Sequence, residues 1–226
     1  MEQFLRELMP NVMNRLPGLW TATVDTIIMM VWSGAISVAI GLVLGIILIV
    51  TRPQGILENK FIFQILDKLV NFFRAIPFII LLTAVMPISR GIMGTAIGVR
   101  GAIVPLIFGT VPFFARQIES ALATLDKGLI EAALSMGCSP FDIIIRVYLK
   151  ESFVPIVRGT MITIISLLGL TAMAGAVGAG GLGDFAIIYG HDRNQTDITY
   201  VTVIVLVVMV SIVQIVGSRI IKKLSH

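Results

Sequence analysis

Long apolar stretches separated by short polar segments dominate the pattern of this chain. No charged residue occurs between Asp25 and Arg52, and Gly159–Val177 is also free of charge. A helix needs about 20 apolar residues to cross a hydrocarbon core about 30 Å thick. The pattern therefore predicts membrane-spanning helices in both stretches, and further ones at about Gly101–Leu122 and Tyr200–Gly217.

The second predicted span is less regular than the others, because only Ala75–Ile88 is fully apolar. Before it, polar residues recur every three or four positions, as on one face of a helix: Lys60, Gln64, Asp67, Asn71 and Arg74. Either a cytoplasmic amphipathic segment leads into a late-starting helix, or Asp67 and Arg74 lie within the span and face a protein-lined interior. We expect Pro77 to bend the helix.

The first twenty residues, Met1–Trp20, mix charged and apolar side chains, which predicts a short helix at a surface. A secretory signal peptide is not expected, because the long apolar run begins only after Asp25 and has no clear small-residue cleavage site. We therefore expect no part of the segment to be removed.

Composition agrees with a membrane protein. The 226 residues are 57% hydrophobic and only 13% charged, and the mean hydropathy is +0.98. Soluble domains carry about 25% charged residues. The net charge of +4 comes from scattered basic residues, so a nucleic-acid-binding face is not expected. The single cysteine, Cys138, can form no internal disulfide.

Residues 129–150 differ from the rest of the chain, because they predict a short helix, a sharp turn and a second helix. Four residues share one helical stripe: Leu129, Ala132, Ala133 and Met136, with Glu131 and Ser135 off it. Gly137 can adopt the left-handed conformation that ends many helices. Ser139 and Pro140 are favoured at the start of the next helix. The first helix, about 15 Å long, is too short to cross a bilayer and must lie at its surface.

This segment is similar to the EAA loop of ATP-binding cassette importer permeases, a cytoplasmic elbow that inserts into a groove on the ATPase. The similarity rests on Glu131, Ala132 and Ala133, followed after three residues by Gly137. It implies a coupling loop at about 124–151 whose ATPase-coupling residues are Glu131, Ala132, Ala133, Leu134, Ser135, Met136, Gly137, Ser139 and Pro140. The family's final proline is replaced by Lys150, which leaves the end of the second helix undefined.

The distribution of basic residues predicts an orientation. If the elbow is cytoplasmic, the inner segments hold ten basic residues: Arg52, Lys60, Arg116, Lys127, Arg146, Lys150, Arg158, Arg219, Lys222 and Lys223. The outer segments hold five: Arg6, Arg15, Arg90, Arg100 and Arg193. This asymmetry fits the positive-inside rule, and five spans then place the N-terminus outside and the C-terminus in the cytoplasm.

A glycine-rich segment has the letters of a dinucleotide-binding motif. The segment with Gly178, Gly180, Gly181 and Gly183 matches G-x-G-x-x-G at every position, but it follows a membrane helix instead of a strand. We interpret it as a flexible or closely packed turn on the outer side. The chain has no phosphate-binding loop of the G-x-x-x-x-G-K-[ST] type, so active transport would need a separate ATPase. His191 and Asp192 predict a solvated loop and no metal site.

Small residues form a stripe along the fourth span: Gly159, Thr163, Ser166, Gly169 and Ala172. Such a stripe is typical of close helix packing, and it can also border a solute path; both uses are compatible across a dimer axis. The translocation path that we predict contains Gly159, Thr163, Ser166 and Gly169, together with Arg74.

Taken in order, four segments resemble the methionine branch of these importer permeases over nearly the whole chain: Thr51-Arg52-Pro53, Arg74–Ile80, the elbow beginning at Gly128, and Gly175–Gly183. The resemblance implies an all-α polytopic membrane protein of the type I importer permease fold, with one domain, 1–226, and five transmembrane helices in the bacterial inner membrane.

The resemblance also implies partners. It predicts a homodimer, two copies of an ATP-binding cassette ATPase, and an extracytoplasmic methionine-binding lipoprotein, for import of L- and D-methionine. ATP and Mg²⁺ would bind to the ATPase, and the chain itself would hold no cofactor, metal or catalytic residue. Two alternatives stay open: the same machine with another cargo, such as phosphonate or a quaternary amine, and a passive channel or scaffold without an ATPase.

Overall fold

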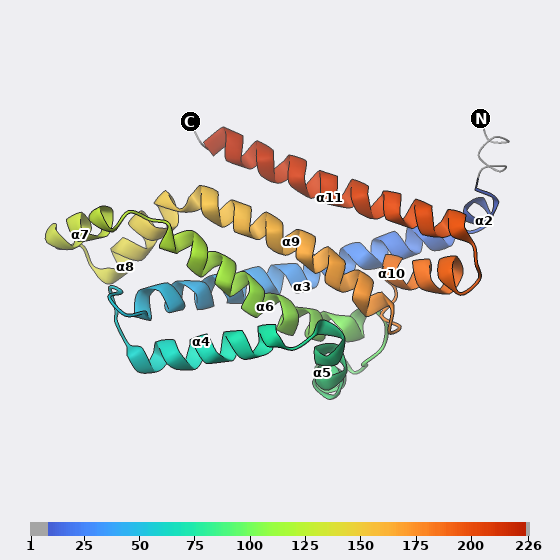
Figure 1. Cartoon of the computed structure of the whole chain (residues 1–226), viewed down its shortest axis with the longest axis horizontal. Helices are drawn as coiled ribbons and strands as arrows, with labels where there is room; N and C mark the ends of the chain where they lie inside the picture. Colours follow the sequence, from blue (N-terminus) through green and yellow to red (C-terminus); the bar gives the residue numbers. More distant parts are fainter. Residues whose placement is uncertain (1–8, 225–226) are drawn as a thin grey trace. The chain divides into compact units, whose positions relative to one another are not determined.

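The computed structural model describes residues 9–224, and within this range the chain consists of helices and turns with no strand (Figure 1). The elements in order are α2 (Pro10–Met13), α3 (Leu16–Thr51), α4 (Lys60–Ala75), α5 (Phe78–Met93), α6 (Gly98–Ala123), α7 (Lys127–Ser135), α8 (Pro140–Asp142), the π-helix η1 (Ile143–Leu149), α9 (Phe153–Gly175), α10 (Gly181–Phe185), the π-helix η2 (Ala186–His191) and α11 (Thr196–Leu224).

Four helices of the described chain are long and apolar enough to cross a membrane: α3, α6, α9 and α11. The count is five if α4 and α5 form one broken span. The helices predicted at Gly101–Leu122, Gly159–Val177 and Tyr200–Gly217 are confirmed as α6, α9 and α11, each extended by a few residues at one or both ends.

The first span begins earlier than predicted. Residues 1–8 of the expected surface helix lie outside the described residues, and α2 covers only Pro10–Met13. Leu16–Trp20 already belong to α3, so the prediction of a separate surface helix up to Trp20 is wrong there. Pro17 lies in the first turn of α3, where proline is well tolerated, and Asp25 is accommodated, half-buried, within the helix.

The chain folds into two compact units. The first unit contains residues 9–35, Pro77–Phe108 and Ile164–Gln214, and the second contains Ile36–Ile76, Gly109–Thr163 and residues 215–224. Helices α3, α6, α9 and α11 each contribute residues to both units. The elbow and the amphipathic α4 belong to the second unit, and the glycine-rich turn belongs to the first.

The first unit has two apolar clusters. One joins Met29, Leu82, Leu106 and Leu167, from α3, α5, α6 and α9. The other is formed by Val12, Ala22, Leu182, Phe185 and Ile198. Burying large aliphatic and aromatic side chains contributes roughly 1.5–3 kcal/mol each relative to water; where parts of the unit face lipid, that gain is smaller. These clusters join residues of seven helices around the glycine-rich turn: α2, α3, α5, α6, α9, α10 and α11.

The core of the second unit is built on α6. Phe114, Ile118 and Leu122 are fully buried on one side of that helix. Helix α3 approaches them closely, because a Cβ at Gly45 would lie only 2.7 Å from the carbonyl oxygen of Ala115. Glycine at this position therefore allows the two backbones to touch, as small residues do in membrane helix pairs.

The second predicted span is broken into two helices. Helix α4 ends at Ala75, Ile76 is extended, and Pro77 precedes the first residue of α5. A residue before proline is driven out of the helical region, so Pro77 interrupts the helix where we predicted a bend. Each of the two interpretations left open by the sequence holds in part. As in a late-starting span, the apolar helix α5 begins only after Pro77. As in a span with a polar interior face, Asp67 contacts another helix through Arg116, whereas Arg74 is exposed.

Candidate functional site

The elbow has the predicted helix, turn and helix. Asp126 begins α7 by accepting the Gly128 N–H at 2.8 Å. Gly137 follows the helix with φ +77°, the left-handed conformation that favours glycine. Ser139 then accepts the Asp142 N–H at 3.2 Å, and Pro140 occupies the first helical position. Local capping interactions thus fix both sides of the turn, which connects α7 to α8 (Figure 1).

The second elbow helix does not stop where the family proline would be. After α8 the chain winds through the π-helix η1, and the helical backbone continues through Lys150 and Glu151. The Ser152 N–H donates to the Tyr148 carbonyl at 3.1 Å, and the Ser152 carbonyl accepts the Ile156 N–H at 2.9 Å. Lysine at position 150 keeps a backbone donor that proline lacks, so the elbow connects to α9 with only a single-residue break.

The elbow is held to the second unit by a few inward side chains. Ala133, Ile143 and Tyr148 are buried in the cluster that contains Phe114 and Ile118. The stripe noted in the sequence does not form one buried face, since Leu129, Ala132 and Met136 are exposed and only Ala133 points inward. The contacts of α7 are therefore narrower than the stripe suggested, and they rest on the small Ala133.

The outer surface of the elbow exposes several large apolar side chains among polar ones. Met136 and Phe141 are 75% and 71% exposed, on either side of Gly137. Leu129 and Leu134 are also exposed. The remaining coupling candidates lie on the same segment and are exposed: Glu131, Ala132, Ser135, Gly137, Ser139 and Pro140. We call Leu129, Leu134, Met136 and Phe141 the elbow surface. Exposed apolar side chains gathered on one element mark interaction sites.

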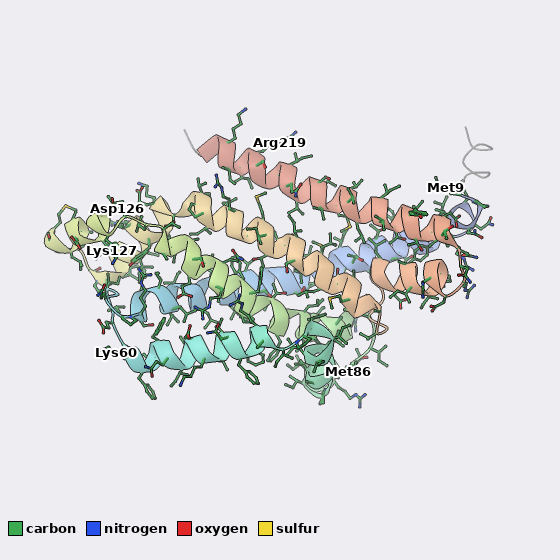
Figure 2. All side chains as sticks on the ribbon, viewed as in Figure 1. Met9, Lys60, Met86, Asp126, Lys127 and Arg219 are labelled. Atoms are coloured by element: carbon green, nitrogen blue, oxygen red, sulfur yellow. The ribbon has the colours of Figure 1, made fainter. Side chains whose placement is uncertain are left out.

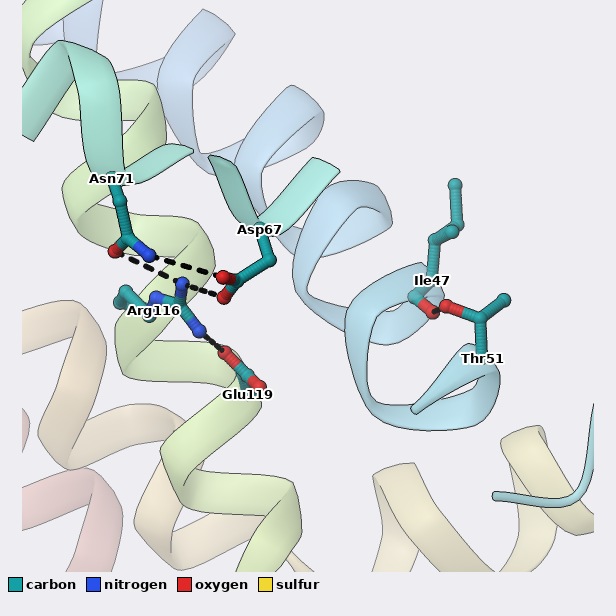
Figure 3. A network of polar contacts seen from close by, with 6 residues as sticks. All are labelled: Ile47, Thr51, Asp67, Asn71, Arg116 and Glu119. Atoms are coloured by element: carbon teal, nitrogen blue, oxygen red, sulfur yellow. Dashed lines mark hydrogen bonds and ion pairs between the residues drawn. The ribbon is translucent and has the colours of Figure 1, made fainter. Parts of the chain in front are cut away.

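A polar network in the second unit joins α4 to α6 (Figure 3). The Arg116 guanidinium pairs with Asp67 and with Glu119. It also donates to the Asn71 side-chain oxygen at 3.1 Å, and the Asn71 amide donates to Asp67 at 3.2 Å. Arg116 and Glu119 lie three positions apart on α6, whereas nothing in the sequence indicated their link to Asp67 on another helix.

The predicted path residues are divided between the two units. In the second unit, a Cβ at Gly159 would lie 3.1 Å from the Gln117 Cβ, and Thr163 is buried and donates to the Gly159 carbonyl at 2.8 Å. In the first unit, Ser166 is half-buried, and a Cβ at Gly169 would meet nothing within 4 Å. Gly159 and Thr163 thus serve helix packing within the chain, while Gly169 leaves an open surface.

The glycine-rich turn is closely packed. Gly178, Gly180 and Gly181 have positive φ angles of 85°, 80° and 78°. A Cβ at Gly183 would lie 2.2 Å from the Ala172 carbonyl oxygen, so no other residue fits there without a shift. The Leu182 N–H donates to the Thr26 hydroxyl at 2.9 Å. Gly181 and Gly183 are thus closely packed, whereas a Cβ at Gly178 would meet nothing within 4 Å. The turn joins two helices instead of a strand and a helix.

The loop beyond this turn is ordered by aromatic and polar contacts. The guanidinium groups of Arg15 and Arg193 lie 4.2 Å and 5.0 Å from the centre of the Tyr189 ring, distances at which cation–π attraction operates. The Asn11 amide donates to Asp197 at 3.1 Å. Within residues 9–224, no three His, Cys, Asp or Glu side chains gather as a metal site would require.

Comparison with known proteins identifies the family of this chain. The sequence matches the family described as binding-protein-dependent transport system inner membrane component over residues 41–226, which includes the elbow and the glycine-rich turn. The chain belongs to this family. It is therefore an inner-membrane component of a transport system, and its elbow lies in a segment that the family shares.

Named relatives cover almost the full chain. The probable D-methionine transport system permease protein MetI of Vibrio cholerae is 45% identical over 208 residues, 92% of each chain. Its counterpart in Pasteurella multocida is 38% identical over 93% of this chain and 99% of that protein. A chain from the inward-facing MetNI methionine ABC transporter superposes with a TM-score of 0.88 at 41% identity, covering 93% and 96% of the two chains.

Proposed function

We propose that this chain is the membrane-spanning permease subunit of an ATP-binding cassette importer that carries methionine, as both L and D forms, into the cell. The observation that carries the proposal is the elbow, a helix, glycine turn and helix that exposes Met136 and Phe141. The relatives of the chain are named as D-methionine transport system permeases, and these names are the basis for proposing methionine as the cargo.

The partner that fits the elbow surface is an ATPase. The chain has no phosphate-binding loop of its own, so the free energy for import must come from a second protein. ATP-driven closure of that partner would move the elbow, and the near-continuous helix from η1 into α9 would transmit the movement. No catalytic group in this chain is required.

Two copies of the chain would form the transport path. Five spans are few to enclose a solute, whereas a two-fold dimer places a shared path between the subunits and presents two elbows to two ATPases. The open surface at Gly169 supports a contact across the dimer axis or a border of the path. An extracytoplasmic binding protein would deliver methionine, and the loop beyond the glycine-rich turn is its expected contact.

The proposed topology has five spans, with α4 and α5 counted as one, the N-terminus outside and the C-terminus in the cytoplasm. The ten-to-five bias of basic residues supports it. Cysteine substitutions at the exposed Met136 and Asp192 test it in intact cells with a membrane-impermeant maleimide. Labelling at position 192 and protection at position 136 are expected; the reverse pattern would invert the topology.

Uptake of labelled methionine tests the cargo. In cells lacking other methionine importers, the chain with its ATPase and binding protein should restore uptake of both L- and D-methionine, and Gly137→Pro should abolish it. Uptake of a phosphonate or quaternary amine in place of methionine would assign a different cargo to the same machine. Uptake that continues without the ATPase would indicate a passive channel.

A further inference from the structure

Beside the elbow surface, the second unit contains a pocket with a volume of about 200 Å³. One wall is the loop between α3 and α4, with Arg52, Gln54 and Ile56, and the other is α7, with Lys127 and Glu131. Tyr148 of η1 also lines it. Figure 2 shows Lys127 beside Asp126, at the beginning of α7. Of the residues that line the pocket, Glu131 and Leu134 belong to the docking elbow, whereas the docking function described above gives Arg52 and Lys127 no role.

The loop wall of the pocket is firmly built. The Leu57 N–H donates to the Val50 carbonyl at 3.0 Å, and the Asn59 N–H donates to the Thr51 carbonyl at 3.0 Å. A Cβ at Gly55 would lie 2.4 Å from the Val50 carbonyl oxygen, so the loop depends on glycine to fold back on the end of α3. The loop wall of the pocket is thus held in place by backbone contacts with the end of α3.

The charges of the pocket are unbalanced. Arg52 and Lys127 bring two positive charges, against one negative charge from Glu131. Neither cation forms an ion pair with any described residue, although Arg52 is half-buried. Burial raises the pKa of the Tyr148 phenol, and the positive charge of Arg52 offsets part of that rise. A half-buried guanidinium normally pairs with a carboxylate or phosphate.

We propose that this pocket receives a carboxylate side chain of the ATPase, which pairs with Arg52 and Lys127 when the elbow docks. The inference rests on the proposed function and extends the interface from the elbow surface to the charged pocket beside it, which we call the socket. The polypeptide ATPase is favoured over a free anion because Leu134, an exposed residue of the elbow surface, also lines the pocket. A charged pair at the edge of an apolar contact fixes its register.

Carbodiimide coupling tests the contact directly, because it joins a lysine amine to a carboxylate in contact with it. The test uses the complete complex of chain and ATPase, purified in mild detergent. We expect an amide bond between Lys127 and an Asp or Glu of the ATPase. Lys127→Arg is the matched control: it keeps the positive charge and the complex, but its guanidinium gives no such product. Coupling of Lys127 only within this chain or to a second copy, or none at all, overturns the proposal.

Charge reversal tests the energetic role. Arg52→Glu should weaken ATPase binding by roughly tenfold or more, and Arg52→Gln should weaken it less. Lys60→Glu makes the same change of charge at an exposed residue that does not line the pocket, and should leave binding within about twofold of the wild type, as for distant surface charges. Equal binding by wild type and Arg52→Glu overturns the proposal. Inorganic phosphate that binds the chain alone and blocks carbodiimide coupling without displacing the ATPase would assign the socket to a free anion instead.

Gly137→Pro separates this inference from the function on which it rests. If the ATPase is retained by the wild type and lost with Gly137→Pro, while Arg52→Glu binds normally and Lys127 does not couple, the elbow docks the ATPase and only the socket is wrong. If the wild type retains no ATPase, the proposed function fails and the socket fails with it.

Discussion

The elbow and the glycine-rich turn have similar sequences of backbone elements, but they differ in how their side chains pack. In each, a helix ends at a glycine with positive φ, a very short α-helix follows, and a π-helix leads into the next long helix. A Cβ at Gly137 would meet nothing within 4 Å, whereas one at Gly183 would strike the Ala172 carbonyl. Phe141 of the elbow is exposed, whereas Phe185 after the outer turn is buried.

The same local motif thus serves two purposes: packing within the chain and contact with a partner. In the glycine-rich turn, Gly181 and Gly183 serve close contact within the chain, although a Cβ at Gly178 would meet nothing within 4 Å, as at Gly137. The elbow completes only its inner side, through Ala133 and Ile143, and presents Met136 and Phe141 to an outside partner. A turn that needs a partner and a turn that does not should respond in opposite ways to substitution.

The largest expected effect is on the packed turn. Gly183→Ala places a methyl group 2.2 Å from a backbone oxygen, and overpacking of this kind should lower the free energy of unfolding by about 3 kcal/mol. Gly137→Ala meets only the strain of a left-handed alanine, about 1 kcal/mol. Thermal unfolding of both variants in detergent measures the difference. Equal losses would mean that the two turns are not packed differently.

The elbow surface should show the opposite behaviour, with binding affected more than stability. Met136→Asp combined with Phe141→Asp removes two exposed apolar side chains, and ATPase affinity should fall by about 2 kcal/mol or more. The unfolding free energy should change by no more than about 0.5 kcal/mol for each substitution, as at exposed sites generally. Titration of the purified variant with ATPase gives the first quantity. Undiminished affinity would remove these residues from the interface.

A smaller effect is expected from the cap of the second elbow helix. Ser139→Ala removes the acceptor of the Asp142 N–H and should cost about 1 kcal/mol of local helix stability. Hydrogen exchange of the amides at the start of α8 should accelerate by roughly fivefold. Ser139→Thr keeps a hydroxyl that can accept from the Asp142 N–H and donate to the Asp142 carboxylate, and it should leave exchange near the wild-type rate. Unchanged exchange in Ser139→Ala would mean that packing of Ile143 alone fixes the helix start.

The smallest expected effect is a pH dependence in the packed turn. Burial raises the pKa of the Asp184 carboxyl. Because the pKa is raised on folding, protonated Asp184 contributes fully to folding stability below the ordinary carboxyl pKa. This contribution is lost as the pH rises through the pKa of Asp184 in the folded state. Asp184→Asn removes this loss, so its melting temperature relative to the wild type should rise as the pH increases above the ordinary carboxyl pKa of about 4. Parallel melting curves would contradict the assignment.

Local signals explain what the sequence could predict. Ser139, Pro140 and Gly137 each act on their own stretch of backbone, so the elbow follows from them without knowledge of the rest of the fold. The apolar runs likewise define α6, α9 and α11. The break between α4 and α5 was indicated by Pro77, although its sharpness depends on Ile76 being extended.

Long-range contacts account for what the sequence could not predict. Asp67 and Arg116 are 49 positions apart, and no spacing rule connects them. Which side of α7 is buried was also undetermined, because Ala132 and Ala133 are equivalent in composition and only packing against Ile143 selects Ala133. The socket beside Arg52 depends on the backbone contact of Leu57 with Val50, and the π-helical winding of η1 has no recognised sequence signal.

Co-purification tests the central claim, that the elbow docks an ATPase, most directly. The tagged chain is solubilised gently, and the proteins that stay bound are identified and counted, beside Gly137→Pro and the double variant Met136→Asp, Phe141→Asp. The account predicts one ATPase per chain, lost or reduced in both variants. A folded wild-type chain that comes out alone in several mild detergents would make the elbow an ordinary surface helix and contradict the account.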